Sequence, residues 1–140
     1  MARKNGKTEV EYKLKWTTKK GSLITEIEKV FNELKNVVNL GHLTYNKYYL
    51  GVNINGKNRV VIKFRPATDH FFLEVCDKTL KGEMLPTLQE AGVPIVYLNS
   101  PKDEPKRYYY RITLGTHADY LQHRDAINSL VSYCYNIYGL

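Results

Sequence analysis

The sequence predicts an α+β protein with a single mainly antiparallel β-sheet and two long helices packed on one face. Two stretches, residues 22–38 and 119–138, repeat apolar side chains at helical spacing. The segments between them are short, and most are rich in β-branched and aromatic residues. Asn55-Gly56 joins two of these segments, and this dipeptide favours a β-hairpin because both residues accept positive φ. Consecutive hairpins predict antiparallel pairing.

The N-terminal elements are a predicted strand and a predicted helix. Residues 9–16 alternate apolar and charged side chains, which indicates a half-buried strand. Its apolar residues are Val10, Tyr12, Leu14 and Trp16. Gly21-Ser22 interrupts the alternation, and the helix at 22–38 follows, with Gly41 just beyond its end.

A meander of three strands is predicted next. The hairpin pairs residues 48–54 with residues 59–65, and Pro66 ends the second of these strands. Residues 70–76 supply the third strand, because they are again rich in aromatic and β-branched side chains.

The remaining elements are a short helix, two strands and a long helix. The short helix is predicted at residues 85–91, and the strands at 95–98 and 106–114. The long helix at 119–138 carries an apolar stripe, and Gly139 is its expected stop.

Composition and charge point to one basic, globular domain. The 140-residue chain is 43% apolar and 25% charged, as is typical of soluble domains. We expect residues 1–8 to form a flexible basic arm and residues 9–140 to form a single domain. The formal net charge is +7, and residues 1–20 hold seven basic and two acidic side chains. Such a charge favours polyanions, although a basic terminus also serves simply to keep a protein soluble.

Membrane and secretion signals are absent from the sequence. No apolar run approaches the ~20 residues of a membrane span, and the first residues lack the apolar stretch of a signal peptide. Cys76 and Cys134 lie far apart in the sequence, which suits reduced, buried thiols. We therefore expect a cytoplasmic protein with no membrane partner.

Motifs for catalysis or metal binding are also absent from the sequence. The four histidines form no His-x-x-x-His pair, and the two cysteines form no Cys-x-x-Cys pair. Glu11-Tyr12-Lys13 resembles half of a restriction-type nuclease centre, but that chemistry needs an upstream Asp, and none precedes Asp69. The glycines never cluster into a phosphate-binding loop. We therefore predict no enzymatic activity, no cofactor and no metal.

Cations occupy one face of three predicted strands, alternating with apolar residues on the other face. The candidate residues for binding nucleic acid or a nucleotide are Lys13, Lys15, Arg59, Lys63, Arg65, Arg107, Tyr109 and Arg111. If these strands share one sheet, its open face offers charges for phosphates and the Tyr109 ring for stacking on a base. The same pattern also suits a solvated face, because exposed strands favour Tyr and Thr, and cations there oppose aggregation.

Tyrosine is overrepresented, with twelve copies against four phenylalanines and one tryptophan. Tyrosine is enriched in protein interfaces because it combines a large contact area with a hydroxyl group. We take Tyr49, Tyr133 and Tyr135 as candidates for a protein-partner or homodimer interface. Half-buried positions at the rim of the core are the alternative for these side chains.

Four strand segments stand in a distinctive order: Tyr48-Tyr49-Leu50-Gly51-Val52, Val60-Val61-Ile62-Lys63-Phe64, Phe71-Phe72-Leu73-Glu74-Val75 and Tyr110-Arg111-Ile112-Thr113-Leu114. Together with the predicted helices, they resemble a family of uncharacterised small domains that occur alone or at the C-terminus of restriction-endonuclease-like and so-called predicted transport proteins. The resemblance covers residues 22–138, and the strand at 9–16 has no counterpart in it. The resemblance implies an accessory role related to nucleic acid or to defence. A compact, basic chain is also similar in style to small phage proteins that bind host defence components.

Two functions follow from these patterns. The leading one is a non-catalytic accessory protein that binds nucleic acid or a nucleotide through a basic, tyrosine-containing sheet face. The alternative is a protein-binding module, such as a small phage inhibitor of a host defence system or a sponge for its nucleotide signal, that acts through the tyrosine-rich surfaces. Salt separates the two, because binding to phosphates weakens steeply with salt and a tyrosine-centred interface responds little.

Overall fold

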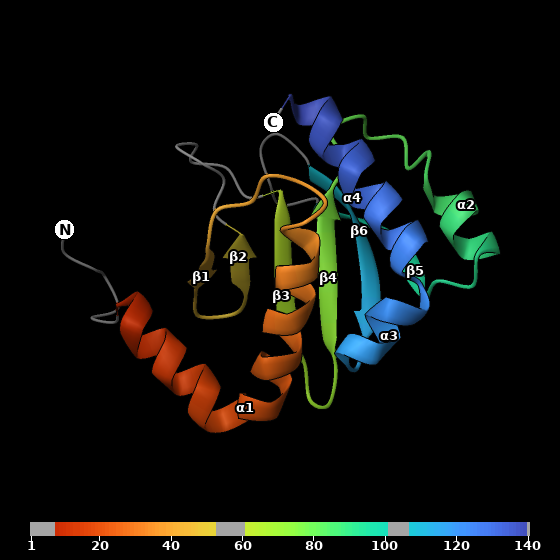
Figure 1. Ribbon diagram of the computed structural model, residues 1–140. Coiled ribbons are helices and arrows are strands. Elements are labelled where there is room, and N and C mark those ends of the chain that lie inside the picture. Colours follow the sequence, from red (N-terminus) through yellow and green to blue (C-terminus); the bar gives the residue numbers. More distant parts are fainter. Residues whose placement is uncertain (1–7, 53–60, 101–106, 140) are drawn as a thin grey trace.

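The computed structural model describes residues 8–52, 61–100 and 107–139, except for the side chains of Ser100 and Arg107. Helices and strands follow one another in this order: α1 (Glu9–Leu34), β1 (Leu43–Tyr45), β2 (Leu50–Val52), β3 (Ile62–Pro66), β4 (Phe71–Cys76), α2 (Leu85–Glu90), β5 (Ile95–Ser100), β6 (Arg107–Leu114), α3 (His117–Gln122) and α4 (Arg124–Tyr138) (Figure 1). The strands form one sheet in the order β1-β2-β3-β4-β6-β5, and every neighbouring pair is antiparallel. The predicted α+β class is confirmed.

The centre of the sheet is β4, which pairs with β3 on one side and with β6 on the other. In this register Glu74 lies between Lys63 of β3 and Arg111 of β6. The same register aligns Phe64, Leu73 and Ile112, which are fully buried. One face of the sheet therefore contributes to the core, and the residues that alternate with it point to the other face.

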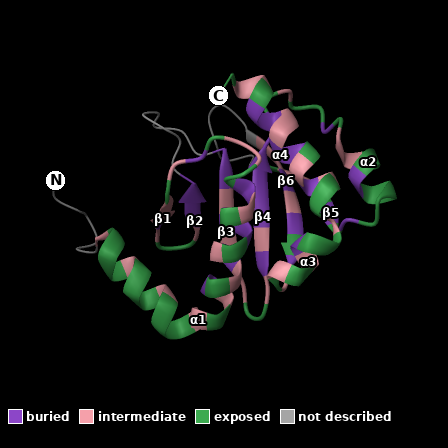
Figure 2. Ribbon diagram, viewed as in Figure 1, coloured by how far each residue is buried: buried purple, intermediate pink, exposed green. Residues whose placement is uncertain are grey.

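The core joins one face of the sheet to the helices. Ile27, Leu34, Leu130 and Cys134, which the sequence predicts as core residues, are all buried. In Figure 1 the second half of α1, α3 and α4 lie in front of the strands. Figure 2 shows that β4 is largely buried, whereas the first half of α1 is mostly exposed. The sheet and helices thus bury a single continuous apolar cluster.

The prediction of a strand at residues 9–16 is wrong, because these residues begin α1. Thr8 and Glu11 form a capping box: the Glu11 backbone N–H donates to the Thr8 hydroxyl at 3.2 Å, and the Thr8 backbone N–H donates to the Glu11 carboxylate at 3.0 Å. Tyr12 and Trp16 lie four residues apart, so a helix places both against the core. Alternation over so few residues fits either element, and the cap together with this packing selects the helix.

Helix α1 changes direction near its middle, as Figure 1 shows. Lys20 has non-helical dihedral angles, φ −140° and ψ 43°, at the point where Gly21-Ser22 interrupts the sequence pattern. The predicted break is therefore a kink between two helical segments. In the first segment Val10 and Leu14 are 76% and 66% exposed, so half of the alternating apolar set faces solvent.

The predicted helix at 119–138 is two helices. His123, with φ −121° and ψ 23°, separates α3 from α4. Helix α3 begins two residues before the prediction, because Thr116 and Asp119 form a second capping box. Gly139 ends α4 in the left-handed conformation with φ 73°, as the sequence predicts.

Several predicted features lie outside the described residues, among them the turn at Asn55-Gly56 and most of the arm at residues 1–8. The strands that flank this turn, β2 and β3, pair in antiparallel fashion as predicted. The short strand β1 is not predicted by the sequence pattern. Within the described ranges, every helix is too short or too polar to cross a lipid bilayer.

Candidate ligand-binding face of the sheet

The face of the sheet opposite the core carries four of the six predicted nucleic-acid-binding residues whose side chains the structure describes. We call it the outer face, and in the central strands it consists of Lys63, Arg65, Phe72, Glu74, Cys76, Tyr109, Arg111 and Thr113. Six of these eight side chains are half-buried or exposed, whereas Glu74 and Cys76 are buried. A solvent-facing sheet surface with a buried carboxylate at its centre is unusual, because carboxylates are rarely buried without partners.

Glu74 is only 1% exposed and contacts two arginines from the neighbouring strands. Its Oε2 accepts from Nε of Arg111 at 2.9 Å, and Nη2 of Arg111 lies 2.8 Å from the same oxygen. Nε of Arg65 donates to this oxygen from 3.4 Å. The charge-assisted contacts compensate for burial of the carboxylate and fix both guanidinium groups around one point.

The other carboxylate oxygen of Glu74, Oε1, is buried and receives no hydrogen bond from any described residue. Lys63 lies opposite Glu74 in the register, but its ammonium group sits 5.1 Å from the centre of the Tyr49 ring. A buried acceptor without a donor costs about 1–3 kcal/mol. The outer face therefore contains an acceptor that the described part of the chain does not use.

Aromatic rings flank the cations of the outer face. The guanidinium carbon of Arg111 lies 4.4 Å from the Phe72 ring centre and 6.0 Å from the Tyr109 ring centre. The guanidinium carbon of Arg65 lies 5.9 Å from the ring centre of Tyr49. These cation–π contacts restrict the cations and keep half-buried ring surfaces beside them.

The donors of the two arginines are only partly used. Arg111 contacts Glu74 through Nε and Nη2, and Arg65 contacts it through Nε alone. Among the described residues, no acceptor takes a hydrogen bond from the remaining guanidinium N–H groups of these two side chains. Together with Lys63 they place three positive charges around a single carboxylate. The outer face is thus net positive and has guanidinium donors to spare.

The structure brings together half of the sequence-predicted binding residues. Lys63, Arg65, Tyr109 and Arg111 share the outer face. Arg59 lies outside the described residues, and only the backbone of Arg107 is described. These two assignments stay predictions.

Lys13 and Lys15 do not belong to the sheet face, because the segment that holds them is helical. Nζ of Lys13 lies 5.5 Å from the ring centre of Tyr45 in β1. Lys15 is exposed on the first half of α1. The prediction of these two lysines as strand residues is wrong, because residues 9–16 are helical. In a helix, residues two positions apart point to different sides, whereas in a strand they share one face.

The three interface candidates have different surroundings. Tyr49 contacts cations of the outer face, as described above. Tyr133 is half-buried and packs against the core. Tyr135 is 1% exposed, a position that does not suit the predicted contact with a partner. It joins the buried stripe of α4, and burial raises its pKa to about 12.

Sequence reasoning missed Glu74 and Phe72 as parts of the site. A signal for Glu74 was present, because it is the only charged residue within the apolar run Phe71-Phe72-Leu73-Glu74-Val75. A charge in the middle of an otherwise apolar strand needs partners on adjacent strands. The strands that supply these partners depend on the pairing and register of the sheet, and the local sequence does not determine either.

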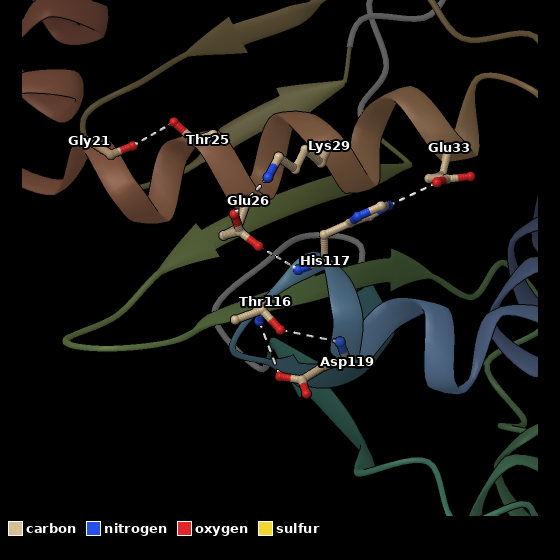
Figure 3. Close-up of polar contacts among 8 residues, drawn as sticks. All are labelled: Gly21, Thr25, Glu26, Lys29, Glu33, Thr116, His117 and Asp119. Carbon is tan, nitrogen blue, oxygen red and sulfur yellow. Dashed lines mark hydrogen bonds and ion pairs between the residues drawn. The ribbon is translucent and has the colours of Figure 1, made fainter.

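A second polar cluster connects α1 to α3, and Figure 3 shows its hydrogen bonds. The backbone N–H of His117 donates to Oε1 of Glu26 at 2.8 Å, and Nε2 of His117 lies 2.8 Å from Oε2 of Glu33. Lys29 donates to Oε2 of Glu26 at 3.3 Å. The His117 backbone hydrogen bond holds the pKa of Glu26 below its usual value. Both carboxylates have partners within the protein, so this cluster joins two helices and is not a candidate ligand site.

The described residues contain no group of three or more His, Cys, Asp or Glu side chains that could hold a metal ion. Comparisons with protein-family models, curated proteins and solved structures find no significant match to this chain. The resemblance to small accessory domains therefore stays a prediction. The outer face is the candidate site among the described residues.

Proposed function

We propose that this protein is a non-catalytic binder of nucleic acid or a nucleotide and that the ligand occupies the outer face. The observation that carries the proposal is the convergence of Arg65 and Arg111 on the buried carboxylate of Glu74, with aromatic rings beside them. The formal charge of +7 supports the same class of ligand, because it attracts polyanions.

A phosphate group suits the two arginines. Both guanidinium groups lie within hydrogen-bond distance of one oxygen of Glu74, so a single phosphate above them can contact both. Glu74 and the ring of Phe72 hold Arg111 in place before the ligand arrives. Prior ordering reduces the loss of side-chain entropy on binding.

The aromatic side chains suit the base of a nucleotide. Tyr49 and Tyr109 are half-buried, so part of each ring faces solvent on the outer face. Bases stack on such rings with little regard to their identity, and neighbouring cations add affinity through the phosphates. Rings and cations in alternation are the arrangement that single strands and nucleotides require.

Two lysine variants test this proposal. Lys63 lies on the outer face, whereas Lys81 is exposed in the segment between β4 and α2, so Lys63→Ala and Lys81→Ala remove the same charge from different places. Fluorescence anisotropy with short single-stranded and duplex oligonucleotides measures affinity at two salt concentrations. We expect Lys63→Ala to weaken binding and to lower the salt slope by about one, with little change for Lys81→Ala. Equal affinities of all three proteins would contradict the proposal, as would absence of binding at low salt.

A protein-binding function is the second candidate, and the first half of α1 favours it. Val10 and Leu14 are exposed on the helix surface, four residues apart, and this half of α1 is mostly exposed in Figure 2. Exposed apolar side chains at this spacing suit contact with a partner helix or a second copy. Light scattering after size-exclusion chromatography compares the wild type with Leu14→Glu. A wild-type dimer that the variant lacks would favour this candidate.

A further inference from the structure

The Glu74 oxygen that receives no hydrogen bond, Oε1, restricts the chemistry of the ligand more than the positive charge of the outer face does. Oε1 lies on the outer face with no donor from the described residues, although Glu74 is 1% exposed. Arg111 contacts only the other oxygen, at 2.8 and 2.9 Å, and Arg65 does the same at 3.4 Å. A carboxylate oxygen without a donor, placed beside two guanidinium groups, is suited to an N–H group that the ligand brings.

We infer that Glu74 accepts a hydrogen bond from the base of the bound nucleotide, so that the outer face recognises an N–H group on the edge of the base as well as the phosphate. This inference rests on the proposed function and adds a chemical requirement to it. A carboxylate oxygen accepts from the exocyclic amino group of adenine or cytosine and from the ring N–H of guanine or uracil. The sugar and the phosphate diester of DNA offer no such donor.

The ligand reaches Oε1 only when a neighbouring side chain moves aside. Arg65 is the side chain that we expect to move, because its 3.4 Å contact with Glu74 is longer than the 2.7–2.9 Å of strong charge-assisted bonds. The Arg65 side chain is also 32% exposed, so its guanidinium group can turn outward toward a phosphate. Arg111 stays on Oε2 through its two short contacts.

Matched oligonucleotides test the inference. Fluorescein-labelled octaadenylate is compared with the octamer of N6,N6-dimethyladenosine, and octauridylate with the octamer of N3-methyluridine. Each pair has the same charge and stacking rings, but the methylated member lacks the donor of its base. We expect the wild type to bind the unmethylated member of each pair roughly 10- to 100-fold more tightly, the range for one hydrogen bond to a charged group.

Glu74→Gln separates hydrogen bonding from the bulk of the methyl groups. The new amide can accept from the arginines only through its carbonyl oxygen, so its NH2 group takes the place of Oε1. The preference for the unmethylated member should then disappear, while thermal melting verifies that the variant is folded. Preference that persists in the folded variant would overturn the inference.

The wild type alone also decides the inference if the variant does not fold. Equal wild-type affinities within both pairs would overturn it and would leave the proposed function standing. Failure of the wild type to bind any of the four oligonucleotides at low salt would overturn the proposed function itself.

Discussion

Two buried carboxylates lie three residues apart in the chain, and their oxygens are used differently. Asp77, just after β4, is 2% exposed, and both of its oxygens accept hydrogen bonds. Oδ1 accepts from the backbone N–H and the hydroxyl of Thr79 at 3.0 and 2.7 Å, and Oδ2 accepts from the Gly82 N–H and the Tyr97 hydroxyl at 2.9 and 2.6 Å. The described donors to Glu74 all contact Oε2, and no described residue donates to Oε1.

The difference separates a fold-forming carboxylate from one that organises a surface. The donors of Asp77 come mainly from the segment that follows it, in which Leu80 has a positive φ of 63°. Such a backbone conformation is rare for a side chain other than Gly and needs support from its surroundings. Glu74 orders two arginines that face solvent and leaves one acceptor unused. The donors to Asp77 hold the segment after β4 in place, whereas Oε1 of Glu74 is left without a donor among the described residues.

The largest effect is expected for Asp77→Ala. This change removes the acceptor for four donors, two of them backbone N–H groups, and should lower the free energy of unfolding by roughly 3 kcal/mol. Urea denaturation followed by circular dichroism measures the change. Asp69→Ala is the matched control, because the Asp69 side chain is 87% exposed and should change stability little. A loss below about 1 kcal/mol for Asp77→Ala would show that the turn holds without its carboxylate.

A ring on the outer face should affect binding and leave stability nearly unchanged. Tyr109→Ala is expected to weaken oligonucleotide binding by roughly 1–3 kcal/mol through loss of one stacked base. Anisotropy titration measures the affinity, and thermal melting verifies the fold. Tyr48→Ala is the control, because Tyr48 is 64% exposed and lies away from the central strands. Unchanged affinity for Tyr109→Ala would remove this ring from the ligand site.

Acid should weaken the fold through groups of the fold-forming kind. Burial raises the pKa of Asp77, but the hydrogen bonds from Tyr97 and Thr79 outweigh it and leave the pKa below its usual value. The pKa of Glu26 is also lowered, mainly by the His117 backbone N–H. A carboxyl group whose pKa is lower in the folded state stabilises the fold above its unfolded pKa, and this contribution disappears as pH falls through the folded value.

Stability should therefore fall as the pH is lowered below the ordinary Asp and Glu pKa values of 3.8 and 4.5. Urea denaturation at a series of pH values from neutral to acid measures the slope. Asp77→Asn should make the slope smaller, because the amide does not titrate. A slope that is the same in the variant would exclude Asp77 as a source of the acid dependence.

A much smaller effect on stability than that of Asp77→Ala is expected for Glu74→Met. Methionine fills a similar volume without a buried unpaired acceptor, and Arg65 and Arg111, whose side chains are 32% and 26% exposed, can be hydrated. Removal of one partner of a buried ion pair costs about 3–5 kcal/mol when the other charge stays buried. Here both guanidinium groups reach solvent, so we expect a change within about 1 kcal/mol in either direction. Urea denaturation beside Asp77→Ala makes the comparison direct. A loss as large as that of Asp77→Ala would show that Glu74 also belongs to the fold-forming class.

Some elements could be predicted because their signals are local. The β4 strand is found within a residue of its predicted bounds, and Gly139 ends α4 at the expected place. The outer-face position of Lys63, Arg65, Tyr109 and Arg111 also follows from alternation along single strands. In each case the information lies in a few neighbouring residues, and the backbone geometry of the element converts it into a position.

Other features depended on packing between distant segments. Apolar and charged residues alternate over residues 9–16 as in a strand. The Thr8 cap and the packing of Tyr12 and Trp16 against the core favour a helix instead. Tyr133 and Tyr135 look alike in the sequence, but the packing of α4 on the core buries Tyr135 almost completely. The spacing of apolar residues indicates the type of element, but it does not show against which part of the protein the element packs.

The sequence by itself determined the α+β class, the positive charge and the strands that bear the cations, because these depend on composition and on periodicity within short segments. Only the tertiary structure placed Arg65 and Arg111 on either side of Glu74, since β4 and β6 are paired across an intervening helix and strand. Hydrogen-bond pairing over such a separation is set by the register of the whole sheet, and a one-residue shift would turn Glu74 toward the core. The unused acceptor, and with it the inferred contact to a base, exists only in that register.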